Sequence, residues 1–307
     1  MNVIGIDTSN YTTSIAWFDG TRGVNCSRLL PVKPGELGLR QSDAVFAHTK
    51  SLPELSGRLF SDIEAANVGA IGVSTRPRAV DGSYMPCFLV GYSHAKLLSD
   101  LLHVPLIEVS HQQGHIAASV WSAGRMELMD QPHLAWHLSG GTTELLLVEP
   151  EGKNVCCTKI GGTTDISAGQ LIDRTGQLLE LPFPSGKHLD ALSREAVLTD
   201  VFRVKCQDGC FSLSGVQNKV QQFHAAHSEP AETAAYALRC VAGAVYTATQ
   251  QALKAYPGLP VVFSGGVASN SMLRQKLAPL NPVFSQPQYS TDNAMGVAVL
   301  AHRISEA

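Results

Sequence analysis

The chain has 307 residues, 44% of them hydrophobic and 16% charged, which is the composition of a globular protein large enough for two modest domains and excludes a disordered chain. No apolar run approaches the roughly 20 residues that are needed to cross a bilayer. The 23 Lys and Arg against 26 Asp and Glu count against a large nucleic-acid footprint, so an RNA substrate would need a local basic patch or a partner protein that carries the charge.

One arrangement of predicted elements occurs twice along the chain. Each copy has an apolar strand, a polar turn and a second strand, and later a further strand, a loop of small residues and a helix. In the first copy these elements cover 3–6, 7–13, 15–18, 70–73, 74–83 and about 84–102. In the second copy they cover 134–138, 139–143, 145–148, 260–263, 264–266 and about 268–277. The repetition predicts a duplicated α/β unit with a ligand cleft between its halves.

The remaining segments are assigned by composition and by helical periodicity. Residues from about 152 to 230 are mixed and rich in glycine, with no clean period. One helix is predicted from about 229 to 255 and a last one from 291 to about 303. We expect a first domain over 1–110 and a second over 111–307, in which the mixed segment is an insertion and the last helix returns to the cleft.

The turns of the predicted hairpins consist largely of Gly, Ser and Thr, as in 139–143. Such turns present backbone N–H groups to a ligand, which is usually a phosphate. The same residues are also simply good turn formers. Three such loops in matching positions favour phosphate over that alternative.

Two histidines one helical turn apart are candidate metal ligands. Ser110 is a plausible N-cap, which would place His111 and His115 on one helix face, where two imidazoles can bind one ion. Exposed or core histidines are the alternative. The H-E-x-x-H signature of zinc peptidases needs a glutamate as general base, whereas this chain has Gln112, so we reject a peptidase at this site.

Asp292 is the candidate third ligand, because a metal held by two histidines normally takes a further protein ligand, often a carboxylate. It lies at the start of the last predicted helix, for which Ser290 or Thr291 is the expected N-cap. An acidic residue at this position also stabilises the helix dipole. The sequence alone favours this second explanation.

The cysteines are an odd number and show no disulfide framework. Because Met1 leads into an apolar strand rather than a basic leader, we expect reduced thiols in a cytoplasmic protein. Cys206 and Cys210 are four residues apart, which does not fit C-x-x-C, so we assign them a structural role. The seven are Cys26, Cys87, Cys156, Cys157, Cys206, Cys210 and Cys240.

Short motifs match those of a known family in order and nearly in spacing, from residue 3 to the end. They are similar to H-x-x-x-H, L-V-S-G-G-H-T-x-L, A-A-G-E-A-F-D-K, P-G-G, F-S-F-S-G, A-G-G-V-S-A-N-x-x-L-R and C-T-D-N-G-A. In this chain they read HQQGH (111–115), HLSGGTTEL (137–145), SAGQLIDR (167–174), PSG (184–186), FSLSG (211–215), SGGVASNSMLR (264–274) and STDNA (290–294). The chain thereby resembles the tRNA threonylcarbamoyladenosine synthase family, formerly called O-sialoglycoprotein endopeptidases.

The resemblance implies a fold and two ligands. The fold is α/β, with the duplicated ribonuclease-H-like domains of the actin-like ATPase superfamily and a nucleotide and metal cleft between them. One divalent metal ion, iron or zinc, would be bound by His111, His115 and Asp292. Glycine-rich backbone can approach phosphate closely, and a carboxylate can accept from ribose hydroxyls. The positions expected to contact an adenine nucleotide or acyl-adenylate are His137, Leu138, Ser139, Gly140, Gly141, Asp173, Gly186 and Asn270.

The resemblance also implies an acyltransferase. The family transfers a threonylcarbamoyl group from its adenylate to the exocyclic amine of adenosine in tRNA, with AMP as leaving group and the metal as Lewis acid. Protein partners of the threonylcarbamoyl transfer system are expected, and tRNA is expected to bind weakly to the chain alone. The alternatives are a carbamoyltransferase paralogue with a non-tRNA acceptor, and a non-catalytic nucleotide-binding partner of a true synthase.

Several positions depart from the family pattern. Tyr11 and Thr12 stand where the family has an acidic pair, Thr142 replaces a histidine and Gln170 replaces a glutamate. The loop 75–78 reads Thr-Arg-Pro-Arg where the family has Gly-Pro-Gly. The residues expected to bind metal and nucleotide thus match the family motifs more often than the acidic residues that could transfer protons. This pattern predicts an altered acceptor or reduced activity.

Overall fold

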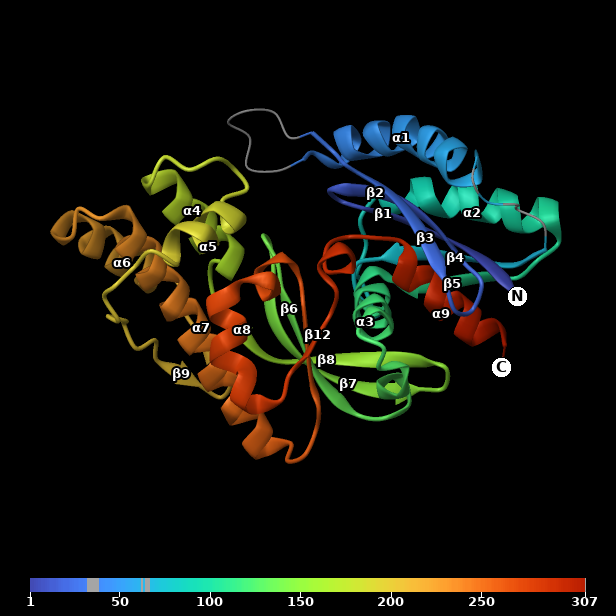
Figure 1. Cartoon of the computed structure of the whole chain (residues 1–307). Coiled ribbons are helices and arrows are strands. Elements are labelled where there is room, and N and C mark those ends of the chain that lie inside the picture. Colours follow the sequence, from blue (N-terminus) through green and yellow to red (C-terminus); the bar gives the residue numbers. More distant parts are fainter. Residues whose placement is uncertain (32–38, 62, 64–66, 307) are drawn as a thin grey trace. The chain divides into compact units, whose positions relative to one another are not determined.

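The computed structural model describes residues 1–31, 39–61, 63 and 67–306 (Figure 1). These residues form two compact units. The first contains 1–131, 149–157 and 288–307, and the second contains 132–148 and 158–287. This division differs from the predicted boundary at residue 110, because the helix that begins at His111 packs on the first unit. No helix among the described residues is long and apolar enough to cross a membrane.

A five-stranded sheet in the order β3-β2-β1-β4-β5 forms the centre of the first unit. β1, β4 and β5 are parallel, and β1 and β2 form an antiparallel hairpin. Helices α1 and α2 cover one face, and α3 and α9 cover the other (Figure 1). The elements are β1 (Asn2–Ser9), β2 (Thr12–Phe18), β3 (Gly23–Leu29), α1 (Gln41–Ser61), β4 (Val68–Arg76), α2 (Phe88–Leu102), β5 (Leu106–Ser110), α3 (His111–Ser122) and α9 (Met295–Ser305).

A seven-stranded sheet in the order β12-β11-β6-β7-β8-β10-β9 forms the centre of the second unit. Its α7 packs on the sheet in a core that includes Trp136 and Phe263. The elements are β6 (His133–Leu138), β7 (Thr143–Glu151), β8 (Asn154–Thr163), α4 (Ala168–Leu178), α5 (Gly186–Ser193), β9 (Cys206–Gln207), β10 (Cys210–Phe211), α6 (Ser214–Ala226), α7 (Pro230–Ala255), β11 (Val261–Ser264), α8 (Ser271–Leu277) and β12 (Val283–Phe284).

The two sheets share one strand order, which confirms the predicted duplication. In the first unit the consecutive strands β1, β2 and β3 lie side by side, and β4 and β5 follow on the other side of β1. In the second unit β6, β7 and β8 repeat this arrangement, and β11 and β12 follow on the other side of β6. The cleft predicted between the halves stays a prediction.

Close packing of α9 on α3 determines where the loop before α9 lies in the first unit. A Cβ on Gly296 of α9 would overlap the carbonyl oxygen of Gly114 in α3, so the two helices approach closely only because this residue is glycine. The loop that precedes α9 therefore lies beside the first turn of α3. This loop contains Asp292, and the first turn of α3 contains His111.

Two predicted helices differ in extent from those observed. The last helix begins at Met295, with Ala294 as N-cap, rather than at Ser290 or Thr291. Asn293 holds the preceding loop out of the helix, because its amide donates to the carbonyl oxygens of Tyr289 and Thr291 and its Oδ1 accepts from the N–H of Met295. The helix predicted from about 268 begins at Ser271, after a 3-10 turn over Gly266–Ser269.

Candidate metal centre and nucleotide-binding loops

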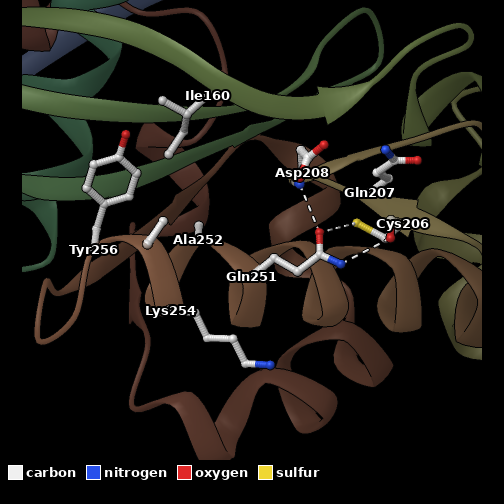
Figure 2. Close-up of a pocket in the computed structure, with 10 residues that line it drawn as sticks. Ile160, Cys206, Gln207, Asp208, Gln251, Ala252, Lys254 and Tyr256 are labelled. Atoms are coloured by element: carbon white, nitrogen blue, oxygen red, sulfur yellow. Dashed lines mark hydrogen bonds between the residues drawn. The ribbon is translucent and has the colours of Figure 1, made fainter.

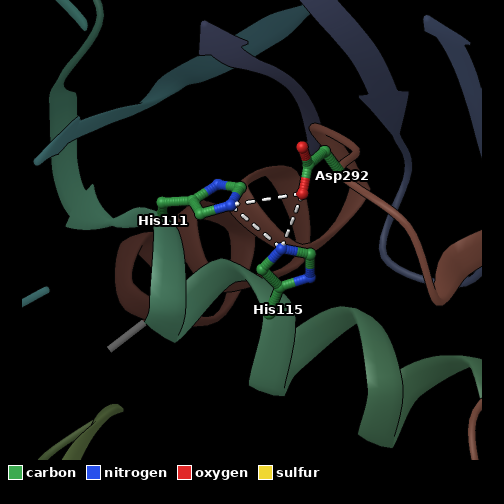
Figure 3. A group of neighbouring side chains, drawn as sticks. All are labelled: His111, His115 and Asp292. Atoms are coloured by element: carbon green, nitrogen blue, oxygen red, sulfur yellow. Dashed lines mark hydrogen bonds and ion pairs between the residues drawn. The ribbon is translucent and has the colours of Figure 1, made fainter. Parts of the chain in front are cut away.

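The predicted ligands His111, His115 and Asp292 lie close together, and they do so within the first unit rather than in the predicted second domain over 111–307 (Figure 3). Ser110 caps α3, and its hydroxyl and the side chain of Gln113 form a reciprocal capping box. The helix therefore begins at His111, and His115 follows one turn later on the same face. The carboxylate of Asp292 reaches both rings from the loop before α9.

The centre lies where parallel strands of the first sheet end. β1 ends just after Asp7, β4 ends just after Ser74, and β5 leads directly into His111. Ligands in open α/β sheets bind beyond the carboxyl ends of the strands, because loops from several strands converge there. The position of the three side chains is thus the one that the topology favours for a site.

The distances between the candidate ligand atoms fit a metal ion. Nε2 of His115 lies 3.0 Å from Nε2 of His111 and 3.1 Å from Oδ1 of Asp292, and the remaining pair is 3.4 Å apart. An ion with bonds of 2.0–2.1 Å holds its ligand atoms about 3.3 Å apart in tetrahedral geometry and about 3.0 Å apart in octahedral geometry. Two imidazole nitrogens and one carboxylate oxygen suit zinc or iron.

The electrostatics of this site favour a cation. Burial alone would lower the pKa of His111, but the carboxylates of Asp7 and Asp292 outweigh it and raise that pKa to about 10. Burial alone would raise the pKa of Asp292, but both histidines hold it well below its usual range. The negative field of the two carboxylates, which favours a proton on His111, also favours a metal ion at the same place. The ion must displace that proton in order to bind.

The position of Asp292 bears on the two explanations of its role. Its carboxylate contacts two imidazoles and precedes α9 by three residues, so it does not lie in the helix whose dipole it was expected to stabilise. These contacts favour the ligand role over the helix-dipole role, and metal binding by Asp292 stays a prediction.

The predicted nucleotide residues converge at one end of the second sheet. β6 and β11 are parallel, with His137 opposite Ser264, so the loops after both strands lie at the same edge. The turn after β6 contains Ser139, Gly140 and Gly141, and the loop after β11 leads to Asn270. This is the edge at which doubly wound sheets bind ligands.

The turn after β6 has the properties of a phosphate-binding loop. Gly140 and Gly141 are exposed, and within the described part of the chain their N–H groups donate no hydrogen bond. The N-terminus of α4 holds this turn in place, because Ser167 Oγ donates to the carbonyl oxygen of Gly140 at 2.5 Å. Two adjacent N–H groups that donate to no acceptor among the described residues are available to donate to an anion. Leu138 is buried in the core, so only its backbone is available.

Asp173 and Gly186 lie together beside this turn. Oδ1 of Asp173 accepts from the N–H of Ser185 at 2.8 Å, and among the described residues no hydrogen bond to Oδ2 is found. Burial raises the pKa of Asp173, against the effect of that N–H. Gly186 opens α5 directly after Ser185. The free carboxylate oxygen can accept from a ligand hydroxyl.

Both polar atoms of the Asn270 side chain bond to the protein itself. Its Oδ1 caps α8 by accepting from the N–H of Leu273 at 3.0 Å, and its Nδ2 donates to Asp190 at 2.6 Å. Asp190 also accepts from the N–H and hydroxyl of Ser271. The geometry therefore supports a bracing role between α5 and α8 for Asn270.

The structure gives reasons for two departures from the family pattern. Oε1 of Gln170 accepts from the N–H of Ser167 at 3.1 Å in the capping box of α4, an acceptor role that glutamine fills as well as glutamate. Tyr11 and Thr12 occupy the β1–β2 hairpin, where Tyr11 is 39% exposed and Thr12 is 7% exposed. Only the first of these two positions could hold an acid without a large desolvation cost.

A separate open pocket of about 560 Å³ lies between the end of α7 and the β9–β10 hairpin (Figure 2). Gln251 braces the hairpin there, because its side chain accepts from the N–H of Gly209 and donates to the carbonyl of Cys206. None of the predicted nucleotide or metal residues lines it. We therefore assign the pocket no part in the chemistry.

Sequence reasoning missed two carboxylates that organise the two sites. Asp7 contacts His111 through Oδ1 at 3.1 Å, and Asp190 contacts Asn270. Asp7 stands in the first strand–turn motif, at the residue where the family motif has its glutamate, which was the available signal. Asp190 carries no such signal, because Asn270 and Ser271, which it holds at the start of α8, lie 80 and 81 residues away.

Comparison with known proteins shows the family of the chain. The sequence model of the tRNA N6-adenosine threonylcarbamoyltransferase family matches residues 38–299. The enzyme of that name from Carboxydothermus hydrogenoformans is 31% identical over 314 residues, which cover 98% of this chain and 91% of the relative. That from Geobacillus thermodenitrificans is 34% identical over 252 residues, 77% of this chain and 70% of the relative.

Solved structures show the fold alone, because their sequences are distant. HypF from T. kodakarensis has a TM-score of 0.64 at 13% identity, over 99% of this chain and 47% of that one. The Clostridium difficile activator of 2-hydroxyisocaproyl-CoA dehydratase, with bound ADPNP, has a TM-score of 0.56 at 14% identity, over 100% and 96%. Both share the actin-like ATPase fold. On sequence and fold together, this chain is a transferase that belongs to the tRNA N6-adenosine threonylcarbamoyltransferase family.

Proposed function

We propose that the protein transfers a threonylcarbamoyl group from its adenylate to the exocyclic amine of adenosine in tRNA, and that AMP leaves. The observation that carries this proposal is the His111–His115–Asp292 cluster at the carboxyl edge of the first sheet. A peptidase would need a general base next to the first histidine, where this chain has Gln112. Family membership supplies the acceptor class, and the cluster supports metal-assisted acyl transfer.

The first unit would bind one divalent ion, iron or zinc, through His111, His115 and Asp292. When bound, the ion would polarise the acyl donor as a Lewis acid and help to orient it. The protein supplies the donor set and a field that favours a cation. Gln113 contributes indirectly, since its capping box fixes where the helix begins.

The second unit would bind the adenylate. The free N–H groups of Gly140 and Gly141 would donate to its phosphate, and the free oxygen of Asp173 would accept from a ribose hydroxyl. Gly186 leaves space at the start of α5, because a Cβ there would meet only the tip of Ile172. These contacts orient the donor without taking part in proton transfer.

The principal rival is a paralogue that carbamoylates a non-tRNA acceptor. The exposed Tyr11 in place of an acid and the slight acidic excess favour it. Under the proposed function, the acidic surface makes partner proteins necessary to bring tRNA to the site. A cytoplasmic location follows from a tRNA substrate.

The metal is tested first. Protein purified without chelator should contain about one equivalent of iron or zinc, and His115→Ala and Asp292→Ala should lose it, because each removes one of three protein ligands. His94→Ala is the matched control, since His94 lies on α2 and, among the residues that the structure describes, its hydrogen bond is to the carbonyl of Val90. Equal metal content in all of these proteins would refute the centre.

The nucleotide is tested by thermal unfolding with AMP or ATP, which should raise the melting temperature by mass action. Asp173→Asn should reduce the gain, because it keeps an acceptor for Ser185 but loses the carboxylate. Asp200→Asn, at an exposed site, should leave the gain unchanged. No shift with metal present would refute nucleotide binding.

The acceptor is tested by reconstitution with the family's partner proteins, threonylcarbamoyl adenylate and unmodified tRNA. Modified adenosine measured by mass spectrometry would support the proposal. Release of AMP with a small amine as acceptor and with tRNA unmodified would establish the paralogue instead.

A further inference from the structure

Asp7 is a buried carboxylate with no exposure to solvent, at the carboxyl end of β1. Oδ2 accepts from the hydroxyl of Ser9 at 2.8 Å. Oδ1 accepts from the hydroxyl of Ser74 and lies 3.1 Å from Nδ1 of His111. A buried carboxylate is costly unless it is paired, so this position requires a reason.

The contact with His111 determines which ring nitrogen carries the proton. Both oxygens of Asp7 already accept hydrogen bonds from serine hydroxyls, which is the bonding pattern of an ionised carboxylate. An ionised carboxylate only accepts hydrogen bonds, so Nδ1 of His111 must be the donor. Nε2 is then left with the lone pair of the neutral ring, and Nε2 is the atom that lies toward His115 and Asp292.

We propose that Asp7 is a positioning residue of the metal centre: it holds His111 with the proton on Nδ1 and directs the Nε2 lone pair at the ion. This inference rests on the proposed metal centre. Metal-bound histidines commonly donate their other N–H to a carboxylate, which fixes the tautomer and raises ligand basicity. Asp7 and Asp292 together also supply two negative charges against a divalent cation.

The network around Asp7 explains how one ring orientation is maintained. Ser9 and Ser74 come from two different parallel strands and hold both carboxylate oxygens. The carboxylate thus has no freedom to turn toward the ion itself.

The test compares zinc affinity by competition with a chelator in the full-length protein. Asp7→Asn should weaken zinc binding by roughly 10- to 100-fold, the usual effect of losing such a partner. Asp7→Glu, which restores the residue common in the family, should retain most of the affinity. Asp165→Asn is the matched control, because it neutralises a well bonded carboxylate of the second unit that has no part in either site, and it should leave zinc affinity unchanged.

A second measurement does not depend on the variants. In the zinc-loaded wild type, ¹⁵N NMR of the histidine rings should show His111 bound through Nε2 and protonated at Nδ1. Coordination through Nδ1 would overturn the inference, as would equal zinc affinity of a folded Asp7→Asn variant. Absence of zinc binding in the wild type is a different result, because it would refute the proposed centre itself.

Discussion

Replacing Asn270 with alanine should destabilise the second unit even when no ligand is present. The substitution removes the N-cap of α8, which costs about 1 kcal/mol, and the hydrogen bond to the Asp190 carboxylate, which is worth roughly 1.5–3 kcal/mol. The expected loss is therefore about 2.5–4 kcal/mol in the free energy of unfolding. A residue whose only role was to contact a nucleotide would show no such loss.

Urea denaturation followed through the fluorescence of the buried Trp136 measures this loss in the second unit. Trp17 and Trp121 belong to the first unit and would be replaced by phenylalanine in the parent protein. Asn218→Ala, the same change at an exposed position of α6, is the control and should shift the free energy by less than about 0.5 kcal/mol.

An exchange of the two side chains sharpens the test. Asn270→Asp keeps a capping oxygen but places a second carboxylate against Asp190, so it should also destabilise. The double variant Asn270→Asp with Asp190→Asn restores a donor and an acceptor and should recover much of the loss. If Asn270→Ala unfolds like the parent but no longer binds nucleotide, the side chain is a ligand contact and the bracing argument fails.

Three further predictions follow from local geometry and charge. Gly169→Ala should weaken nucleotide binding several-fold in a titration, because its Cβ would lie 2.5 Å from the carbonyl oxygen of Ser139 and displace the turn after β6. Gly215→Ala is the control, since a Cβ there meets no atom within 4 Å. Equal nucleotide affinities of the two variants would refute the bracing of the turn. Tyr11→Asp should raise the rate of tRNA modification in the reconstituted system, and an unchanged rate would show that the missing acid does not limit activity. Thr12→Glu should instead lower the melting temperature, because the side chain at this position is buried. The isolated chain, with 23 basic and 26 acidic residues, should bind tRNA weakly in filter assays, and tight, steeply salt-dependent binding would contradict this reading of its surface.

Strand and turn patterns were readable from the sequence because they are local. The apolar run at 3–6 and its counterpart at 134–138 predict strands, and the structure has β1 and β6 there. Helix α1 was not predicted, because its buried positions include His48 and Ser51 as well as leucines, which weakens the apolar stripe. The segment from about 152 to 230 contains α4, α5 and α6, whose short amphipathic patterns are interrupted by glycine and by loops.

The sequence by itself determined the duplicated α/β fold, the family and the pair of histidines, since strand periodicity, motif order and the spacing of one helical turn are all properties of neighbouring residues. Only the tertiary structure shows which side chains Asp292, Asp7 and Asn270 contact. Asp292 lies 177 residues from His115, and Asn270 lies 80 residues from Asp190. A carboxylate at a helix start has the same local sequence whether it faces solvent or a pair of imidazoles. The difference comes from the close packing of α9 on α3 and from the convergence of parallel strands, which bring distant side chains to one edge.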